Sequence, residues 1–158
     1  MKAHSRRLDF FADENFSTAI LQILRVFAEH HACANSKRFQ CHFAHVTDHC
    51  KPGAPDEEWM PIAAAKIPKP IILGGDGRIL THPLRLAVLK RANLSFVCLA
   101  EGYVNVPFQQ QVFKVLKAWD HVCQSASSAS SPTMFRIGMN SKVVMFKRLS
   151  EIRAQELV

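Results

Sequence analysis

Two kinds of apolar pattern alternate along the chain. Short runs of consecutive apolar residues predict buried strands, and longer segments with an apolar residue every three or four positions predict helices. Strands are expected at residues 8–12, 39–46, 71–73, 95–100, 135–139 and 142–146. Helices are expected at about 17–31, 56–66, 81–91 and 107–122. This alternation predicts a three-layer α/β/α sandwich with a mostly parallel sheet.

Polar and turn-forming residues separate these elements. Ser17 is placed to cap the first helix, and acidic residues open the second, where they favour the helix dipole. A loop is expected at 47–55, and the Ser/Ala-rich segment 124–132 predicts a second, mobile loop. Residues 150–158 predict a short helix or a loose tail. No internal repeat or domain boundary is visible, so one domain over residues 1–158 is expected.

The composition is that of a globular chain with a strong positive charge. The chain has 158 residues, 48% hydrophobic and 21% charged, which is enough to bury a core without disulfides. There are 20 Lys and Arg residues against 13 Asp and Glu, which gives a formal net charge of +7. Such a charge favours a polyanionic partner, with nucleic acid ahead of an anionic membrane.

Neither membrane insertion nor secretion is expected. The longest apolar stretches fall short of the ~20 residues that span a bilayer. Asp9, Asp13 and Glu14 interrupt the apolar run after the basic start, so no signal-peptide core forms. The five cysteines are an odd number, which fits reduced thiols better than a disulfide framework. A soluble, cytoplasmic protein with no membrane partner is therefore expected.

Acidic residues gather at one edge of the predicted sheet. They follow the first, third and fourth strands or open the helix that leads into the third, and they are Asp13, Asp76, Glu101 and Asp56. Glu14 and Glu57 are immediate neighbours of two of these positions. In open α/β sheets, ligands bind beyond the carboxyl ends of the strands. The spacing therefore predicts an acidic pocket at this edge.

A hard divalent cation would make such a pocket favourable. Carboxylates brought together in a partly dry cleft repel one another. Mg²⁺ or Mn²⁺ takes oxygen ligands, and it can activate water and stabilise charge on a phosphodiester. Lys and Arg residues of a basic protein would meanwhile hold the flanking phosphates. The plain alternative is that each acid is a turn residue, or in the case of Asp56 a helix cap.

Three segments resemble the acidic blocks of the PIN-like nuclease superfamily, in that family's order. They are Phe10-Phe11-Ala12-Asp13-Glu14-Asn15, then Gly53-Ala54-Pro55-Asp56-Glu57-Glu58-Trp59 followed by Ala63-Ala64-Ala65, then Ile71-Ile72-Leu73-Gly74-Gly75-Asp76-Gly77-Arg78-Ile79. The first half of the chain carries the match, and the second half follows it in outline. In particular, the chain resembles the compact PIN-like proteins related to VapC toxins.

The resemblance implies a Mg²⁺- or Mn²⁺-dependent ribonuclease that hydrolyses RNA phosphodiester bonds, as the toxin of a toxin–antitoxin pair does. The catalytic metal ligands would be Asp13, Asp56 and Asp76, with Glu14, Glu57 and Glu101 as further metal ligands. A cognate antitoxin protein and a homodimer would be its protein partners. One position departs from the family pattern, because Gly74 stands where the family usually has Thr or Ser.

Several other side chains have both a functional and a structural interpretation. Arg78 and Lys51 are candidates for contacts with RNA phosphates, as are Arg85 and Lys90, and each is otherwise a solvated surface cation. Trp59 is expected to pack its helix on the sheet rather than to stack on a base. The segment 143–146 predicts either an edge strand open to pairing or an interior strand.

A stretch rich in His and Cys lies before the second acidic block. Its members are His30, His31, Cys33, Cys41, His42, His45, His49 and Cys50. Zinc sites use such ligands in closely spaced pairs, and the cysteines here are too far apart for that. If 39–46 is a strand, Cys41 and His45 lie on one face and His42 on the other. Buried thiols and surface imidazoles are therefore expected, although a zinc-stabilised interaction domain is a rival.

Two other classes of protein compete with the nuclease. A receiver domain of a response regulator also has acids after its first and third strands. It would need a small hydroxyl residue where Ala100 stands, and a late Lys-Pro pair that the sequence lacks. The stronger alternative is a non-catalytic PIN-like module that binds RNA or a partner protein. Tight RNA binding without metal and without cleavage would favour that alternative.

Overall fold

A computed structural model describes residues 5–34, 39–75, 77–129 and 132–148 of the chain. Within these ranges six strands form one sheet in the order β2-β1-β3-β4-β5-β6. The strands are β1 (Arg6–Ala12), β2 (Phe39–His45), β3 (Ile71–Gly74), β4 (Ser95–Leu99), β5 (Thr133–Ile137) and β6 (Val143–Arg148). All neighbouring pairs are parallel except β5 and β6, which are antiparallel.

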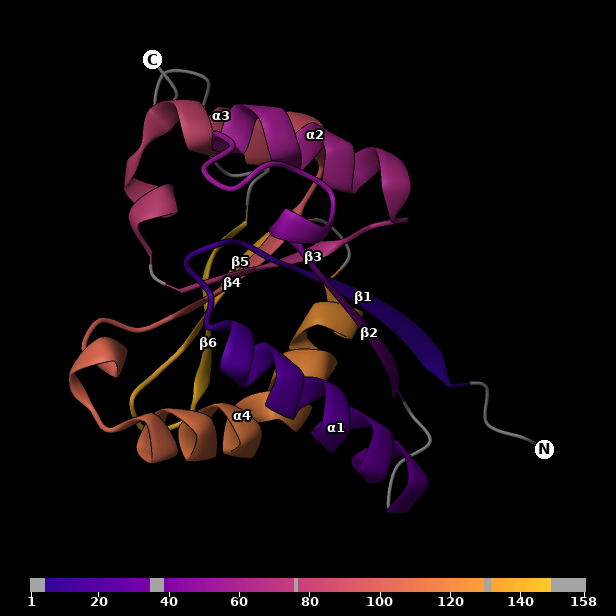
Figure 1. The fold of residues 1–158 in the computed structure, drawn as a ribbon, viewed down its shortest axis with the longest axis vertical. Coiled ribbons are helices and arrows are strands. Elements are labelled where there is room, and N and C mark those ends of the chain that lie inside the picture. The colour runs from indigo at the N-terminus through magenta and orange to yellow at the C-terminus, as the bar shows by residue number, and fades with distance from the viewer. Residues whose placement is uncertain (1–4, 35–38, 76, 130–131, 149–158) are drawn as a thin grey trace.

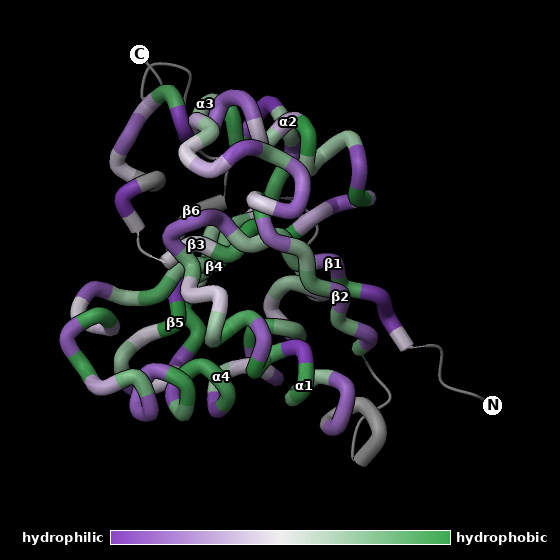
Figure 2. The backbone as a smooth tube through the Cα atoms, in the orientation of Figure 1, coloured by the Kyte–Doolittle hydropathy of each residue, from purple (hydrophilic) through white to green (hydrophobic). Residues whose placement is uncertain are grey.

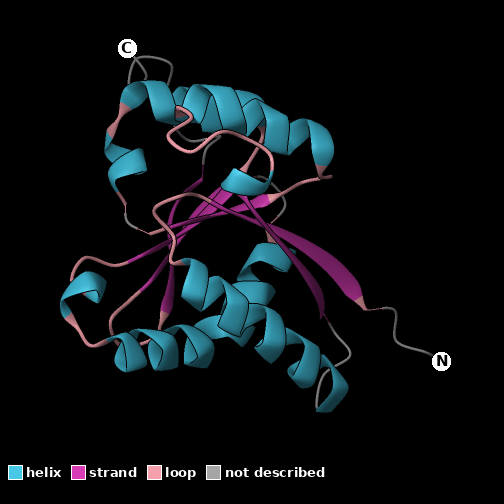
Figure 3. Cartoon of the chain, viewed as in Figure 1, coloured by secondary structure: helices cyan, strands magenta, loops and turns pink. Residues whose placement is uncertain are grey.

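Helices cover both faces of this sheet (Figure 1). The helices are α1 (Thr18–Ala34), α2 (Asp56–Lys66), α3 (Pro83–Ala92) and α4 (Phe108–Ser128). In Figure 3, α1 and α4 lie below the strands, and α2 and α3 lie above them. The predicted three-layer α/β/α sandwich with a mostly parallel sheet is confirmed.

The alternation of side chains along β1 divides the core between the two faces. Phe10 packs on the side of α1 and α4, where its ring lies 4.8 Å from that of Trp119. Phe11, the next residue, packs on the side of α2, where it stacks on Trp59. Because both faces are covered, the last three residues of β1, Phe10, Phe11 and Ala12, are all apolar and buried rather than alternating with polar residues.

Helix α4 is longer than the sequence pattern predicts. The segment 124–128, expected to belong to a loop, continues the helix to Ser128. Figure 2 shows hydrophobic and hydrophilic residues alternating along α4. Near the end of this helix, Val122 and Cys123 are buried. The last turn is also held from outside the helix, because Arg6 Nη1 donates to the carbonyl oxygen of Ser127 at 3.1 Å. Such a contact satisfies a carbonyl that a helix end leaves unpaired.

Other differences from the predicted elements are small. Helix α1 runs to Ala34, past the expected end near residue 31. Strand β5 begins and ends two residues earlier than expected. Strand β6 lies at an edge of the sheet, which confirms the edge interpretation of 143–146. Residues 150–158, expected to form a helix or a tail, lie outside the described residues.

The His/Cys-rich stretch is divided as the strand pattern predicts. In β2, Cys41 packs against the core beneath α4, and His42 is exposed. Cys41 Sγ lies 3.6 Å from Cys123 Sγ, and the hydrogen bond between the two thiols lowers the pKa of Cys41. The expectation of surface imidazoles is wrong for His45, which is buried at the end of β2 with Nδ1 2.7 Å from Thr47 Oγ1. Across the described ranges, no helix has both the length and the apolar character needed to cross a membrane.

Candidate active site

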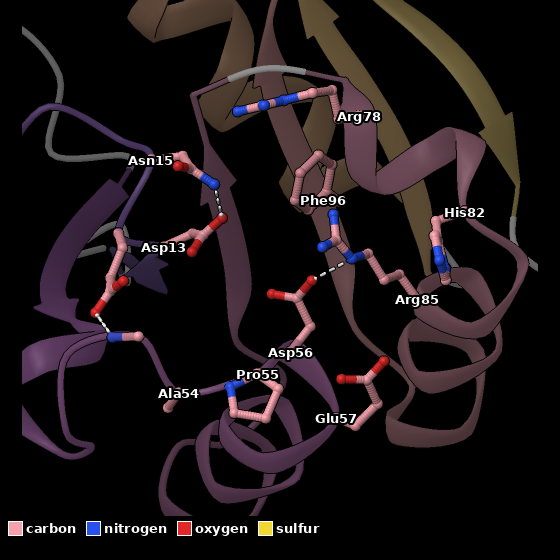
Figure 4. A pocket seen from close by; sticks show the side chains of 12 residues that line it. Asp13, Asn15, Ala54, Pro55, Asp56, Glu57, Arg78, His82, Arg85 and Phe96 are labelled. Atoms are coloured by element: carbon pink, nitrogen blue, oxygen red, sulfur yellow. Dashed lines mark hydrogen bonds and ion pairs between the residues drawn. The ribbon is translucent and has the colours of Figure 1, made fainter.

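A cleft of about 450 Å³ opens beyond the carboxyl end of β1 (Figure 4). Four segments meet around it: the turn after β1, the loop into α2, the start of α3 with the residues before it, and β4. Its lining residues are Asp13, Glu14, Asn15, Gly53, Ala54, Pro55, Asp56, Glu57, Arg78, His82, Arg85 and Phe96. The first two of the three segments that resemble acidic blocks therefore contribute acidic side chains to one cleft, and the third contributes Arg78.

Asp13 is held at the end of β1 by the neighbouring strand. Its backbone N–H donates to the carbonyl oxygen of Leu73 in β3 at 2.9 Å. Asn15 Nδ2 donates to Asp13 Oδ2 at 3.4 Å. Burial raises the pKa of Asp13 above its ordinary value, and the negative charge of Asp56 raises it further. Asp13 is therefore a partly desolvated carboxyl group that faces a second carboxylate.

The turn after β3 comes very close to the turn after β1, and only glycine permits this. A Cβ atom at Gly75 would lie 1.8 Å from the carbonyl oxygen of Asn15. Because that oxygen belongs to the backbone, no side-chain movement would relieve the overlap. Gly75 thus allows the ends of β1 and β3 to meet where the first and third acidic blocks follow them.

Asp56 is the first residue of α2, but it does not cap the helix. Pro55 is the N-cap residue, and no side-chain capping hydrogen bond forms there. Instead the carboxylate of Asp56 has two partners from this chain. Trp59 Nε1 donates to Oδ1 at 3.0 Å, and Arg85 Nε forms an ion pair with Oδ2 at 2.8 Å.

Trp59 fixes Asp56 to the core of the protein. Its side chain is only 1% exposed, and its ring lies 5.6 Å from the ring of Phe11 with an interplanar angle of 8°. The expectation that Trp59 packs α2 on the sheet is confirmed. One turn of helix separates Trp59 from Asp56, so the same residue also orients the carboxylate.

Glu14 and Glu57 occupy different positions at the cleft. Glu14 Oε1 accepts a hydrogen bond of 2.6 Å from the backbone N–H of Gly53. This contact ties the loop before α2 to the turn after β1, across 39 residues of sequence. Glu57 is exposed and lines the cleft beside Asp56.

The remaining predicted residues are placed differently. Asp76, the third acid, lies outside the described residues. Glu101 is exposed at the end of β4, and Lys51 is exposed in the loop before α2; neither is among the described residues that line the cleft. Arg78 lines it. Arg85 is partly exposed to solvent, as expected for a surface cation, but it is also paired with Asp56.

From the sequence, no role at the site was assigned to Asn15, His82 or Phe96, and the ion pair of Arg85 was not predicted. One signal was available: Pro83 marks the start of α3, so His82 and Arg85 fall at the edge where β3 ends. The contacts themselves join segments that are distant in sequence, so no local pattern of residues predicts them.

The position of Gly74 is explained by Phe96. A Cβ atom at Gly74 would lie 2.4 Å from Cζ of Phe96. The phenyl ring, 1% exposed, fills the space beside Gly74 and forms part of the cleft lining. A Thr or Ser side chain at this position would overlap the ring unless the ring moved.

Charges of both signs line the cleft. Figure 4 shows Asp13 and Asp56 pointing into it, with the guanidinium groups of Arg78 and Arg85 and the ring of His82 around them. Within the described part of the chain, no three His, Cys, Asp or Glu side chains are grouped so that they could hold a metal ion. Asp76, the third member of the predicted acidic set, lies outside this part of the chain.

Comparison with known proteins identifies one relationship. The sequence model of the family described as PIN like domain matches residues 8–101, more than half of the chain. The matched region begins in β1, ends just after β4, and contains all residues that line the cleft. No curated protein and no solved structure matches the chain.

Proposed function

Because the chain belongs to the PIN-like domain family, we propose that it is a Mg²⁺- or Mn²⁺-dependent ribonuclease acting in the cleft beside β1. The family has a nuclease-type fold, and the three-layer α/β/α architecture agrees with it. The positive net charge of +7 suits a polyanionic substrate such as RNA. The toxin role, the cognate antitoxin and the homodimer stay predictions from the family resemblance.

The observation that carries this proposal is the pairing of Asp13 with Asp56. These carboxyl groups come from separate elements, and the charge of one raises the pKa of the other in a partly buried cleft. Such an arrangement is unfavourable for a fold by itself, because it combines desolvation with like-charge repulsion. Perturbed carboxyl groups in a cleft are typical of functional sites.

The donor set suits a hard divalent cation. Asp13 and Asp56 supply carboxylate oxygens to the cleft, which are the ligands that Mg²⁺ and Mn²⁺ prefer. We assign these two residues, together with Asp76, as the ligands. When bound, the ion would supply the Lewis acidity that activates water and stabilises the charge developing on the phosphodiester.

The other residues of the cleft would hold the carboxylates and the substrate. Asn15 orients Asp13 and Trp59 orients Asp56 through the hydrogen bonds described above. Arg78 and His82 both line the cleft in the segment that leads into α3, and His82 directly precedes that helix. There they would bind phosphates next to the scissile bond. Glu14 keeps the loop before α2 against the turn after β1.

Cleavage of RNA by the purified protein tests the proposal. The wild-type protein is compared with Asp13→Asn and Asp56→Asn, with and without Mn²⁺. Glu29→Gln serves as a matched control, because it removes one exposed carboxylate from α1, on the opposite face of the sheet. We expect metal-dependent cleavage by the wild type and the control, and loss of at least about a hundredfold in rate in both Asp variants.

Two other outcomes would overturn the proposal. Cleavage that is equal in all four proteins would come from a contaminating nuclease. RNA binding that needs no metal and is never followed by cleavage would favour the non-catalytic binding module instead.

A further inference from the structure

Both oxygens of Asp56 are engaged by side chains of this chain, and the two partners differ in how firmly they are held. Trp59, which donates to Oδ1, is 1% exposed and fixed by stacking on Phe11. Arg85, which pairs with Oδ2, has a side chain that is 41% exposed. The hydrogen bond from Trp59 is therefore part of the packed core, whereas the side chain of Arg85 is partly exposed to solvent.

The ion pair satisfies Asp56 in the way that a metal ion would. Asp56 is only 14% exposed, so its charge needs a compensating cation nearby. Arg85 provides that cation at 2.8 Å, on the oxygen that Trp59 leaves available. A divalent cation at the same oxygen would meet the positive charge of the guanidinium group at close range. The two cations cannot both be close to Oδ2 without strong repulsion.

We propose that Arg85 is an internal cation that competes with the divalent metal ion for Oδ2 of Asp56 and thereby lowers the metal affinity of the site. This inference rests on the proposed function, since it concerns the same cleft. Metal binding then requires Arg85 to turn away from Asp56, and the cleft of about 450 Å³ beside it has room for the displaced side chain. The prediction is unusual because removal of a residue at the site strengthens metal binding.

Direct measurement of Mn²⁺ binding tests this competition without any need for activity. Free Mn²⁺ is followed by electron paramagnetic resonance as it is titrated into the wild-type protein and into Arg85→Gln. Arg91→Gln is the matched control, because Arg91 is an exposed arginine on the same helix that borders a different hollow, between α2 and α3. Each variant removes one positive charge from α3, so the change in the net charge of the protein is the same in both.

We expect Arg85→Gln to bind Mn²⁺ about tenfold more tightly than the wild type, which corresponds to about 1.4 kcal/mol. Arg91→Gln should stay within about twofold of the wild type. Arg85→Ala serves as a second variant if the Gln side chain itself contacts Asp56. Thermal unfolding of each variant, expected within a few degrees of the wild type, shows that the fold is intact.

Unchanged or weaker Mn²⁺ binding by both Arg85 variants would overturn the inference. So would equal strengthening in Arg91→Gln, because the effect would then be one of net charge. Asp56→Asn separates this failure from failure of the proposed function. If the wild type binds Mn²⁺ and Asp56→Asn does not, only the role of Arg85 is at stake. If the wild type and Arg85→Gln both fail to bind Mn²⁺, the metal site itself is wrong.

Discussion

Two residues at the strand ends determine how the cleft is built. Gly75 permits a backbone contact that any larger residue would prevent, and this contact joins the turns after β1 and β3. Asp13 is placed by that junction in a partly buried position opposite Asp56. The first of these features favours the fold and the second acts against it, so substitutions at the two positions are expected to have opposite effects on stability.

Gly75→Ala is expected to destabilise the protein by about 3 kcal/mol, because the new methyl group would overlap the carbonyl oxygen of Asn15. Urea unfolding measures the change. Gly53→Ala is the control: Gly53 has a φ of +80° but no atom within 4 Å of the added Cβ, so only the local strain of about 1 kcal/mol is expected. Equal losses in the two variants would contradict the close contact at Gly75.

Asp13→Asn is expected to stabilise the protein at neutral pH while it abolishes metal-dependent cleavage. The pKa of Asp13 is raised in the folded state, so the contribution of Asp13 to stability is fully present below its pKa in the unfolded chain and is lost as pH rises through its pKa in the folded state. The Asn variant lacks this dependence. At pH 7 in the presence of a chelator, a gain of about 1 kcal/mol would raise the melting temperature by roughly 2–4 °C.

The gain should shrink toward zero near pH 3, where Asp13 is protonated in both the folded and the unfolded wild type. Glu29→Gln gives the baseline for an exposed carboxylate. A variant that melts below the wild type at pH 7, or a gain that does not change with pH, would contradict the environment assigned to Asp13.

At the scale of elements, α2 connects the core to the cleft within one helical turn. Its buried side, with Trp59 and Met60, packs on the sheet, and its first residue places Asp56 at the cleft. Residues three apart lie on neighbouring positions of a helix, which is why Trp59 reaches back to the carboxylate. The helix therefore orients Asp56 through packing rather than through a capping bond.

Trp59→Phe is expected to keep most of the packing but to lose the hydrogen bond to Asp56 Oδ1. The free energy of unfolding should fall by about 2 kcal/mol, since hydrogen bonds to charged groups contribute about 1.5–3 kcal/mol. Mn²⁺ affinity should fall several-fold because Asp56 is no longer held. Met60→Leu, a volume-conserving change in the same buried row, should cost less than about 1.5 kcal/mol and leave Mn²⁺ affinity unchanged. Equal Mn²⁺ affinities in the two variants would contradict the orienting role of Trp59.

At the scale of the whole molecule, charge is distributed unevenly. The chain carries +7 in total, yet four acidic side chains line one cleft. A uniformly basic surface would bind RNA but would not hold a cation at the scissile phosphate. The combination favours binding of flanking phosphates by Lys and Arg around an acidic centre.

RNA binding by Asp13→Asn, which is expected not to cut its substrate, should therefore weaken steeply with salt. If three or four phosphates are neutralised, affinity for a single-stranded RNA should fall about 20- to 50-fold between 50 and 200 mM NaCl. Fluorescence anisotropy of a labelled oligonucleotide measures this. Affinity that does not change with salt would contradict a phosphate-based interface.

The elements and the edge at which the acids lie could be predicted from local patterns. Apolar runs and helical spacing depend on neighbouring residues, so the strands, helices and layer order follow from them. The end of α4 could not be predicted in this way, because Ser125, Ser127 and Ser128 are of a residue type that favours caps and turns over helix interiors. Burial of Cys123 and the bond from Arg6 extend the helix to Ser128.

The contacts that give the cleft its chemistry were decided only by the tertiary structure. The sequence by itself determined that Asp13 and Asp56 would lie at one edge, because each sits next to a readable strand or helix end. It did not determine that Arg85 would pair with Asp56, that Phe96 would fill the space beside Gly74, or that Glu14 would bind Gly53. These contacts join α3 to α2, β4 to β3, and the turn after β1 to the loop before α2. Each pair of segments is distant in sequence, and no local pattern of residues predicts such a contact.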